Sequence, residues 1–437
     1  MSDAEHAMPS SGSKASMGFW QVWSMTVGVM IGSGIFLLPA VMVPYGGLGF
    51  LGWVLSGCGA ILIALILGRL ASRTPRTGGP YAYAHDAFGN LAGFLVGWGY
   101  WLAVVFAISA VGVAFAGYMA SLIPVLEGNP LAQAAVAVAM IWLLTAINMR
   151  GIAEGAAVQL LMSVLKLLPL LVIIALGVFA GTIDNIPAFN PEAKPILPAL
   201  AATALLTMWA FLGIEAGVIP AGDVINARRT IPRAVIFGTL CVTTVYIAST
   251  AAVMMLVPAN VLATSTAPFV DAAKTLGPLG APLIAIGALV ATAGSMNGNI
   301  LLGGQMPMAV ALDGLAPKFL ARRNQGHAPF FSLLISSSIA TVLLLFNYAD
   351  GLVAAFTFLL SMSTLSTLMP YAVSALADLR YSWKQARGWA AIAMITIAFT
   401  LMAMIGSGLK VLIWGVPMLA AGIPVFYVFK RARSTNL

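Results

Sequence analysis

Charged side chains are scarce in this chain. Of its 437 residues, 8% are Asp, Glu, Lys or Arg, whereas 61% are hydrophobic. A soluble globular protein carries roughly 25% charged residues, so most of the surface of this protein does not face water. The composition therefore excludes an ordinary soluble domain. It predicts an integral membrane protein with lipid against most of its surface.

Cysteine is nearly absent as well. Cys58 and Cys241 are the two cysteines, and both lie inside apolar runs, so a disulfide framework is not expected. The chain has no HExxH motif, no close pair of carboxylates in an apolar run and no Cys/His cluster with metal-ligand spacing. An enzyme, a metal site and a bound cofactor are therefore not predicted.

Long apolar runs are what the chain has in abundance. Residues 1–17 are polar and lack the layout of a signal peptide, so they are expected to form a disordered cytoplasmic tail. Twelve apolar segments follow, each near the ~20 residues that a spanning helix needs. The chain shows no ~10-residue alternating segments of a β-barrel, so the expected fold is an all-α integral membrane protein with twelve transmembrane helices in one membrane domain. The approximate ranges are 18–43, 48–72, 91–124, 131–149, 155–180, 200–221, 234–257, 281–311, 330–347, 352–376, 388–406 and 410–429.

Basic residues are distributed unevenly between the two sides of this arrangement. The side with both termini carries 17 of the 21 Lys and Arg residues, whereas the other side carries Lys194, Lys274 and Lys410, and Lys166 lies within a span. Because the richer side is normally cytoplasmic, both termini are expected in the cytoplasm and the protein in the plasma membrane, which in a bacterium is the inner membrane. The net charge of +8 is an orientation signal and does not predict nucleic-acid binding.

Glycine is concentrated where a membrane helix tolerates it least. The first span contains "VGVMIGSGIFLLPA" (27–40), and the sixth contains "ALLTMWAFLGIEAGVIPAGDV". An unmade backbone hydrogen bond costs several kcal/mol in the bilayer, so a break there needs a cavity or a solute to satisfy it. Freed amide groups suit a carboxylate and freed carbonyls suit an ammonium, which points to an amino acid. Close helix packing is the alternative explanation for a single glycine cluster.

The two interrupted spans are five spans apart. Many secondary transporters consist of two inverted repeats whose corresponding helices break at the membrane midplane. Five is odd, so repeats of five spans would have opposite orientations. The predicted organisation is a first repeat at 18–180 (helices 1–5), a second repeat at 200–376 (helices 6–10) and two further helices at 388–430.

Five motifs occur in order along the chain: "IGSGIFLLP", "TGGPYAYAHDAFG", "GWGYW", "MWAFLGIEAG" and "DVINARRTIPRA". As a set they resemble the amino acid–polyamine–organocation transporters, most closely the basic amino acid/polyamine antiporters that include the arginine/agmatine exchanger. The resemblance runs from about Gly18 to the twelfth span. It implies a five-plus-five inverted repeat, discontinuous helices 1 and 6, alternating access to a central site and, as in many relatives, a possible homodimer.

The resemblance also implies which residues meet the small-molecule substrate. The unwound parts of helices 1 and 6 hold its carboxylate and amine, an aromatic ring packs over it, and a tyrosine–glutamate–tyrosine set forms the inner gate. The implied gate residues are Tyr100, Glu215 and Tyr371. The implied substrate-binding residues are Met30, Gly32, Ser33, Gly34, Ala103, Val104, Ile108, Trp209, Phe211, Leu212, Gly213, Asn299 and Ser363.

Two of these positions depart from the arginine exchanger. Ile108 stands where that exchanger has an asparagine in helix 3, and Asn299 stands where it has a tryptophan in helix 8. In the exchanger these residues help to seat the guanidinium group and to close the outer side. The apolar wall at Ile108 suits a side chain that is smaller or less polar than that of arginine.

Two ionisable residues lie at membrane depth, where a charge costs at least ~2.5–3.5 kcal/mol. One is Glu215. The other is Lys166, about 12 residues from Glu154 and so roughly 18 Å into the membrane, beyond the reach of a snorkelling lysine. Sodium-independent and proton-coupled members of the superfamily resemble this chain in having a lysine there. The hypothesis is that the Lys166 ammonium replaces a sodium ion, contacts helices 1 and 8, and couples proton exchange to transport; a permanently charged structural lysine is the alternative.

The predicted function is therefore secondary active amino acid transport by alternating access. Its leading form is sodium-independent antiport of cationic amino acids or polyamines, such as arginine and agmatine, as the resemblance implies. The alternative is proton-coupled uptake of a neutral amino acid that uses Lys166. A channel is more remote, because the chain shows neither a filter motif nor a charged ring.

Overall fold

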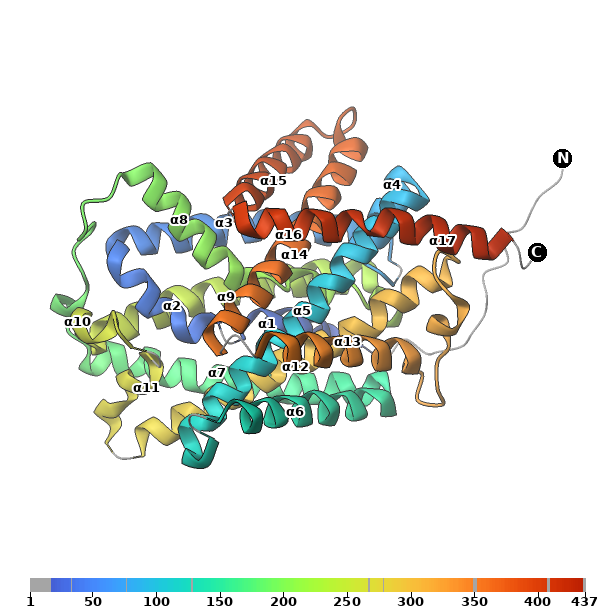
Figure 1. The fold of residues 1–437 in the computed structure, drawn as a ribbon. Coiled ribbons are helices and arrows are strands. Elements are labelled where there is room, and N and C mark those ends of the chain that lie inside the picture. Colours follow the sequence, from blue (N-terminus) through green and yellow to red (C-terminus); the bar gives the residue numbers. More distant parts are fainter. Residues whose placement is uncertain are drawn as a thin grey trace.

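The computed structural model describes residues 17–434 except 33, 76, 127–128, 266–267, 278, 349–351 and 407–408. This part of the chain is a bundle of helices (Figure 1), without a β-sheet; a single isolated bridge joins Met17 and Val224. The α-helices are α1 (Phe19–Met30), α2 (Gly34–Met42), α3 (Gly47–Arg73), α4 (Pro80–Phe88), α5 (Asn90–Leu122), α6 (Pro130–Arg150), α7 (Ile152–Ala180), α8 (Ile196–Met208), α9 (Ala227–Leu256), α10 (Ala259–Leu262), α11 (Pro268–Ala273), α12 (Gly280–Leu312), α13 (Phe330–Tyr348), α14 (Leu352–Ser382), α15 (Arg387–Gly406), α16 (Leu409–Ala420) and α17 (Gly422–Ser434).

Short 3-10 turns connect or interrupt these helices. The turns are η1 (Val43–Tyr45), η2 (Pro124–Leu126), η3 (Ile183–Asn185), η4 (Trp209–Phe211), η5 (Ile214–Gly217), η6 (Ala221–Asp223), η7 (Lys274–Leu276) and η8 (Lys318–Ala321).

Ten helical segments in the described part of the chain are long and apolar enough to cross a membrane. They coincide with ten of the twelve predicted segments. The first predicted segment is divided between α1 and α2, and the ninth forms α13, whose apolar stretch Phe330–Phe346 is shorter. The chain is thus an all-helical integral membrane protein, whereas twelve crossings and an inverted repeat remain predictions.

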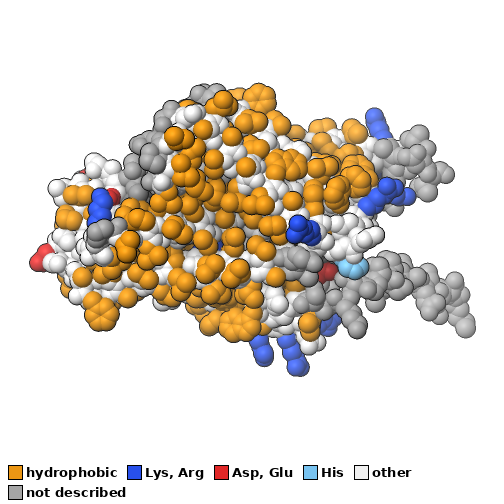
Figure 2. Space-filling model, turned by 90° about the horizontal axis from the view of Figure 1, so that it is seen from below, with side chains coloured by type: hydrophobic (Ala, Val, Ile, Leu, Met, Phe, Trp, Pro, Cys, Tyr) orange, Lys and Arg blue, Asp and Glu red, His pale blue; other side chains and the backbone are white. Residues whose placement is uncertain are grey.

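The outer surface of the bundle is apolar. Figure 2 shows hydrophobic side chains over most of one face, with Lys and Arg side chains mostly toward its right-hand end, the end at which Figure 1 places both termini. Phe179 and Phe346 are 88% and 78% exposed. Contiguous apolar surface of this kind is rare on soluble monomers and is suited to contact with lipid. The scarcity of charge in the sequence is explained by this surface.

Polar side chains tie the helices together inside the bundle. The Asn148 side chain of α6 donates to Asn297 Oδ1 of α12 (2.8 Å), and Asn297 Nδ2 donates to Gln159 Oε1 of α7 (3.0 Å). All three residues are buried. In an apolar surrounding each unmade hydrogen bond is costly, so this chain of amides favours one relative rotation of α6, α7 and α12.

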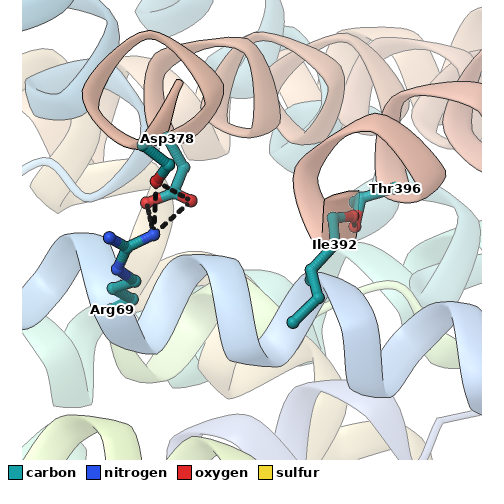
Figure 3. A network of polar contacts seen from close by, with 5 residues as sticks. Arg69, Asp378, Ile392 and Thr396 are labelled. Atoms are coloured by element: carbon teal, nitrogen blue, oxygen red, sulfur yellow. Dashed lines mark hydrogen bonds and ion pairs between the residues drawn. The ribbon is translucent and has the colours of Figure 1, made fainter. Parts of the chain in front are cut away.

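A second polar cluster joins α3, α14 and α15, and Figure 3 shows its ion pair between Arg69 and Asp378. Arg69 Nη1 lies 2.8 Å from Asp378 Oδ2 and 2.5 Å from Ser382 Oγ, and the guanidinium group lies 4.6 Å from the centre of the Trp389 ring. Asp378 is fully buried. Removing one partner of such a pair would leave an uncompensated charge, so the cluster fixes the packing of the three helices at one end of the bundle.

The structure corrects the predicted end of the N-terminal tail. Residues 1–16 lie outside the described part of the chain, but Met17 is buried and belongs to the fold. Its amide N–H donates to Asp223 O (3.0 Å), and the Ile225 N–H donates to Met17 O (2.9 Å). A polar composition could not reveal these backbone hydrogen bonds, because any residue type can make them.

Candidate functional site

The first span is interrupted where its glycines are. Helix α1 ends at Met30, and Ile31 has extended dihedral angles (φ −76°, ψ 94°) while its N–H still donates to Val27 O (2.9 Å). Helix α2 begins at Gly34. The amide groups in the first turn of α2 have no acceptor within their own helix and carry partial positive charge. Ser33, a predicted substrate-binding residue, lies outside the described residues.

The sixth predicted span is interrupted over a longer stretch. Helix α8 gives way to the 3-10 turn η4, Leu212 is extended, and Gly213 has a positive φ of 111° before η5 begins. Only glycine adopts this conformation readily. A Cβ at Gly213 would also lie 2.6 Å from the Val29 side chain of α1. Gly213 therefore permits both the break itself and its close approach to the break in the first span.

The two breaks enclose one cavity together with α5, α12 and α14. Its volume is about 60 Å³, room for a few water molecules at roughly 10–15 Å³ each and less than ligand pockets usually offer. A solute as large as an amino acid therefore requires the cavity to widen. The cavity is lined by Val29, Met30, Gly32, Gly34, Tyr100, Ala103, Val104, Ala107, Val111, Trp209, Ala210, Leu212, Gly213, Glu215, Ser295, Asn299, Ser363 and Thr367.

Most of the described residues that the resemblance implied lie in this lining, with three exceptions. Ile108 and Phe211 are fully buried outside it, and Phe211 packs with Trp53 and Tyr246 instead. Tyr371 also lies outside the lining but hydrogen-bonds to the lining residue Glu215.

Six lining residues were missing from the sequence prediction: Val29, Ala107, Val111, Ala210, Ser295 and Thr367. Helical spacing would have identified four of them. Ala107 and Val111 share a face of α5 with Tyr100, Ala103 and Val104, because residues three and four apart lie on one side of a helix. Thr367 lies one turn after Ser363 by the same rule. Ser295 lies one turn before Asn299 on α12. Val29 and Ala210 give no such signal, although they adjoin the predicted residues Met30 and Trp209 in the sequence.

Glu215 lies at the centre of a buried hydrogen-bond cluster. The Tyr100 hydroxyl donates to Glu215 Oε1 (2.8 Å), and the Tyr371 hydroxyl donates to Glu215 Oε2. The Gly213 N–H in turn donates to the Tyr371 hydroxyl (3.3 Å). The cluster lies on the cavity side toward the start of α5 and the end of α14, which is the end of the bundle with both termini. It links the break in the sixth span to α5 and α14.

Lys166 lies against the other side of the first break. It is fully buried, and its Nζ donates to Gly28 O (2.5 Å) and Ile31 O (2.8 Å). The last carbonyls of a helix lack intrahelical donors and attract cations, so one ammonium group compensates the end of α1. Gly294 of α12 lies next to this ammonium group.

The neighbouring carbonyls of α1 also have side-chain donors. Ser295 Oγ of α12 donates to Val29 O (3.2 Å), and the single proton of the Tyr246 hydroxyl of α9 is shared between Met30 O (2.6 Å), the nearer acceptor, and Ala210 O (3.1 Å). The sequence interpretation expected these carbonyls to be bare and available to the ammonium of a solute. The protein supplies one donor to each of them, which leaves a second lone pair on each oxygen, so their contact with a solute stays a prediction.

Polar groups elsewhere in the cavity are few. Asn299 Nδ2 donates to Ser295 O (2.9 Å), and Ser363 Oγ donates to Ala103 O (2.9 Å). Glu215 is the one ionisable carboxyl group among the described lining residues, and both of its oxygens accept from tyrosines. In the described part of the chain no three His, Cys, Asp or Glu side chains lie together as a metal site would require.

Known proteins match the chain over nearly its whole length. Residues 17–429 match the model of the amino acid permease family. The cadaverine/lysine antiporter of Escherichia coli is 30% identical over 90% of this chain and 90% of its own length. The arginine/ornithine antiporter of Pseudomonas aeruginosa is 28% identical over 92% and 88%, and the arginine/agmatine antiporter of Chlamydia caviae is 29% identical over 95% and 90%. The chain therefore belongs to the amino acid permease family, whose members are membrane transporters and not enzymes.

Proposed function

We propose that this protein is a sodium-independent amino acid antiporter that works by alternating access. The observation that carries the proposal is the pair of helix breaks around one cavity, because non-helical backbone at membrane depth is tolerated only where it faces protein or a cavity. Both breaks bring polar backbone to a space that is otherwise mostly apolar. The antiporters named among the relatives support exchange as the mode of transport.

Solute binding is proposed to begin at the start of α2. The first amides of α2 and its N-terminal partial charge would receive the solute carboxylate. The Trp209 ring lies directly against Gly34, where any side chain would collide with it. Trp209 would therefore cover the solute, and an indole face also attracts a cationic group.

The cluster of Tyr100, Glu215 and Tyr371 is proposed to be the inner gate. It connects the sixth-span break to two helices that line the cavity, so opening this side requires its hydrogen bonds to separate. A solute that widens the cavity would displace Leu212 and Gly213, which line it and directly precede Ile214 and Glu215 in the chain. Binding and gate opening would thereby be coupled through the backbone of one short segment.

Lys166 is proposed to replace the cation of sodium-coupled relatives. Its ammonium donates to two carbonyls at the end of α1, so no added cation is needed to compensate them. Loss of its proton would remove the positive charge that strengthens both hydrogen bonds to the end of α1. Transport is therefore expected to depend on pH and not on sodium.

Basic amino acids and their amines are the proposed substrates, following the names of the relatives. The test uses purified protein in liposomes loaded with unlabelled arginine, lysine, agmatine or cadaverine. Labelled arginine is expected to accumulate only in liposomes that hold an exchangeable solute, and equally in sodium and choline buffers. Accumulation that needs sodium, or flux that does not saturate, would overturn the proposal.

Neutral amino acids are a second candidate, favoured by one observation. The α5 wall of the cavity consists of Ala103, Val104, Ala107 and Val111, and the carboxylate of Glu215 is already paired with two tyrosines. No described lining group is thus left to neutralise a cationic side chain. Liposomes with alanine or leucine under an inward proton gradient decide between the candidates: net uptake without internal solute supports the neutral, proton-coupled permease.

A further inference from the structure

A second and larger cavity opens at the end of the bundle that carries both termini. Its volume is about 420 Å³, and it lies between the start of α5, the end of α12, η8, α13 and the end of α17. Its walls are almost wholly apolar, with Phe94 and Trp98 from α5, Val310 from α12, and Phe429 from α17. This groove shares no lining residue with the cavity between the helix breaks.

The polar groups in the walls of this groove are already satisfied. The indole N–H of Trp98 donates to Met418 O (3.1 Å), that of Trp101 donates to Ser336 Oγ (2.8 Å), and the Ser332 hydroxyl donates to Leu320 O (2.9 Å). The groove therefore offers little to water or to a polar solute. An occupant that fits it is apolar along its length.

The basic rim of the groove consists of two lysines that adjoin its lining residues in the sequence. Lys318 precedes the lining residue Phe319, and Lys430 follows the lining residue Phe429. Both lysines are exposed, and neither forms an ion pair with a carboxylate of the described residues. Phe319 is itself exposed, so the groove opens directly beside one of these charges.

We propose that this groove binds an anionic phospholipid, with an acyl chain between α5, α12, α13 and α17 and the phosphate between Lys318 and Lys430. An acyl chain matches the apolar walls, and a phosphate matches the basic rim, so one molecule satisfies both features. Basic pockets between membrane helices on the cytoplasmic side bind lipid head groups in this manner. The site is separate from the transport cavity and is independent of which solute is carried.

Photo-crosslinking tests the proposal directly. The purified full-length protein is placed in nanodiscs with phosphatidylglycerol or phosphatidylcholine, each carrying a photoreactive group near the end of one acyl chain. Phosphatidylglycerol is expected to label peptides that contain Phe94–Trp101 and Phe429, and phosphatidylcholine to label them far less. The K318Q/K430Q variant should lose about 25-fold in labelling at limiting lipid, at roughly five-fold per basic residue at a membrane surface.

A matched variant separates this site from general surface charge. Lys384 and Arg387 are exposed at the turn between α14 and α15 and do not line the groove, so K384Q/R387Q should keep the labelling. Ala316→Phe, which fills the groove, should abolish labelling while leaving the protein folded by thermal unfolding. The proposal would be overturned if both lipids labelled the groove equally or if K318Q/K430Q kept full labelling. It would also be overturned if the protein were a dimer that Ala316→Phe converts to a monomer, because the occupant of the groove would then be a second copy of this chain.

Discussion

Lys166 is the one described side chain with a charge that donates to the end of α1. It supplies the hydrogen bonds that Gly28 O and Ile31 O lack within the helix, and a hydrogen bond to a charged group contributes about 1.5–3 kcal/mol. Lys166→Ala is therefore expected to lower the free energy of unfolding by ~3 kcal/mol or more and to abolish exchange. Thermal unfolding and counterflow in liposomes measure the two effects.

Leu168→Ala is the control for this substitution, because Leu168 belongs to the same helix but is exposed on its outer surface. It should change neither quantity by much. If Lys166→Ala kept the full exchange rate and the pH profile of the unmodified protein, the ammonium would have no part in coupling.

Tyr371 tests the gate without removing a charge. Tyr371→Phe deletes the hydroxyl that donates to Glu215 and accepts from the Gly213 N–H, and a buried group left unsatisfied costs about 1–3 kcal/mol. The closed gate should lose that stability, which shifts the population toward the open form by roughly tenfold. A thiol reagent should then reach Thr367→Cys in the cavity faster, in a background in which Cys58 and Cys241 are replaced by serine.

The control for the gate is Tyr427→Phe, since Tyr427 is exposed on α17 and does not line the transport cavity. Its labelling rate should match that of the parent. Unchanged labelling in Tyr371→Phe would show that these hydrogen bonds do not hold the cavity closed.

The sequence predicted one of the side-chain contacts to the break in the first span, that of Lys166, but did not predict the others. Lys166 stood out because its charge is costly at membrane depth. Tyr246 and Ser295, which donate to Met30 and Val29, did not stand out. Their contact with the break depends on the rotation of α9 and α12, and packing between helices sets that rotation.

At the scale of the element, Gly213 sets the shape of the sixth-span break. Gly213→Ala would force a residue with a Cβ into a φ of 111° and place that carbon 2.6 Å from Val29. Strain of this kind costs of order 1–3 kcal/mol. The variant is expected to have a lower melting temperature and to lose most of its exchange, because the break can no longer lie against α1.

Gly388→Ala is the matched control, since nothing lies within 4 Å of the added carbon. Its melting temperature and exchange rate should equal those of the parent protein. A Gly213→Ala variant with normal stability and normal counterflow would mean that the break is not needed in this conformation.

The glycine clusters predicted where the elements break but not what replaces the helix. The first break is short, whereas the second passes through η4, extended Leu212 and η5. Apolar residues such as those of Trp209–Phe211 suit an α-helix and a 3-10 turn equally well by composition. The choice is made by tertiary contacts such as that between Phe211 and Tyr246.

At the scale of the molecule, the low charged fraction and the long apolar segments were sufficient to predict the fold class, an all-α integral membrane protein. A chain with so little charge can bury its backbone polar groups in lipid only as helices or as a closed barrel. The contacts between segments that are far apart in the sequence could not be predicted, because single residues make them. Met17, Asp223 and Arg323 are an example: they join the start of the chain, the loop after the sixth span and the loop after α12.

Asp223 gives this junction a predictable dependence on pH. Burial raises the pKa of its carboxyl above the usual 3.8, and the opposing attraction of Arg323, 3.7 Å away, and of His327 is smaller. A raised pKa means that the folded protein holds this proton more tightly than the unfolded chain does. The contribution of Asp223 to stability is therefore fully present at acid pH and is lost as the pH rises from the usual value through the raised one.

Asp223→Asn removes this titration while keeping the shape of the side chain. The melting temperature of the unmodified protein, relative to that of Asp223→Asn, should fall as the pH is raised from about 4 to about 8. Thermal unfolding of both proteins in the same detergent, at a series of pH values, measures the difference. The opposite result, in which the unmodified protein gains stability relative to Asp223→Asn as the pH rises, would contradict this prediction. It would mean that the ion pair with Arg323, and not burial, determines the charge of Asp223.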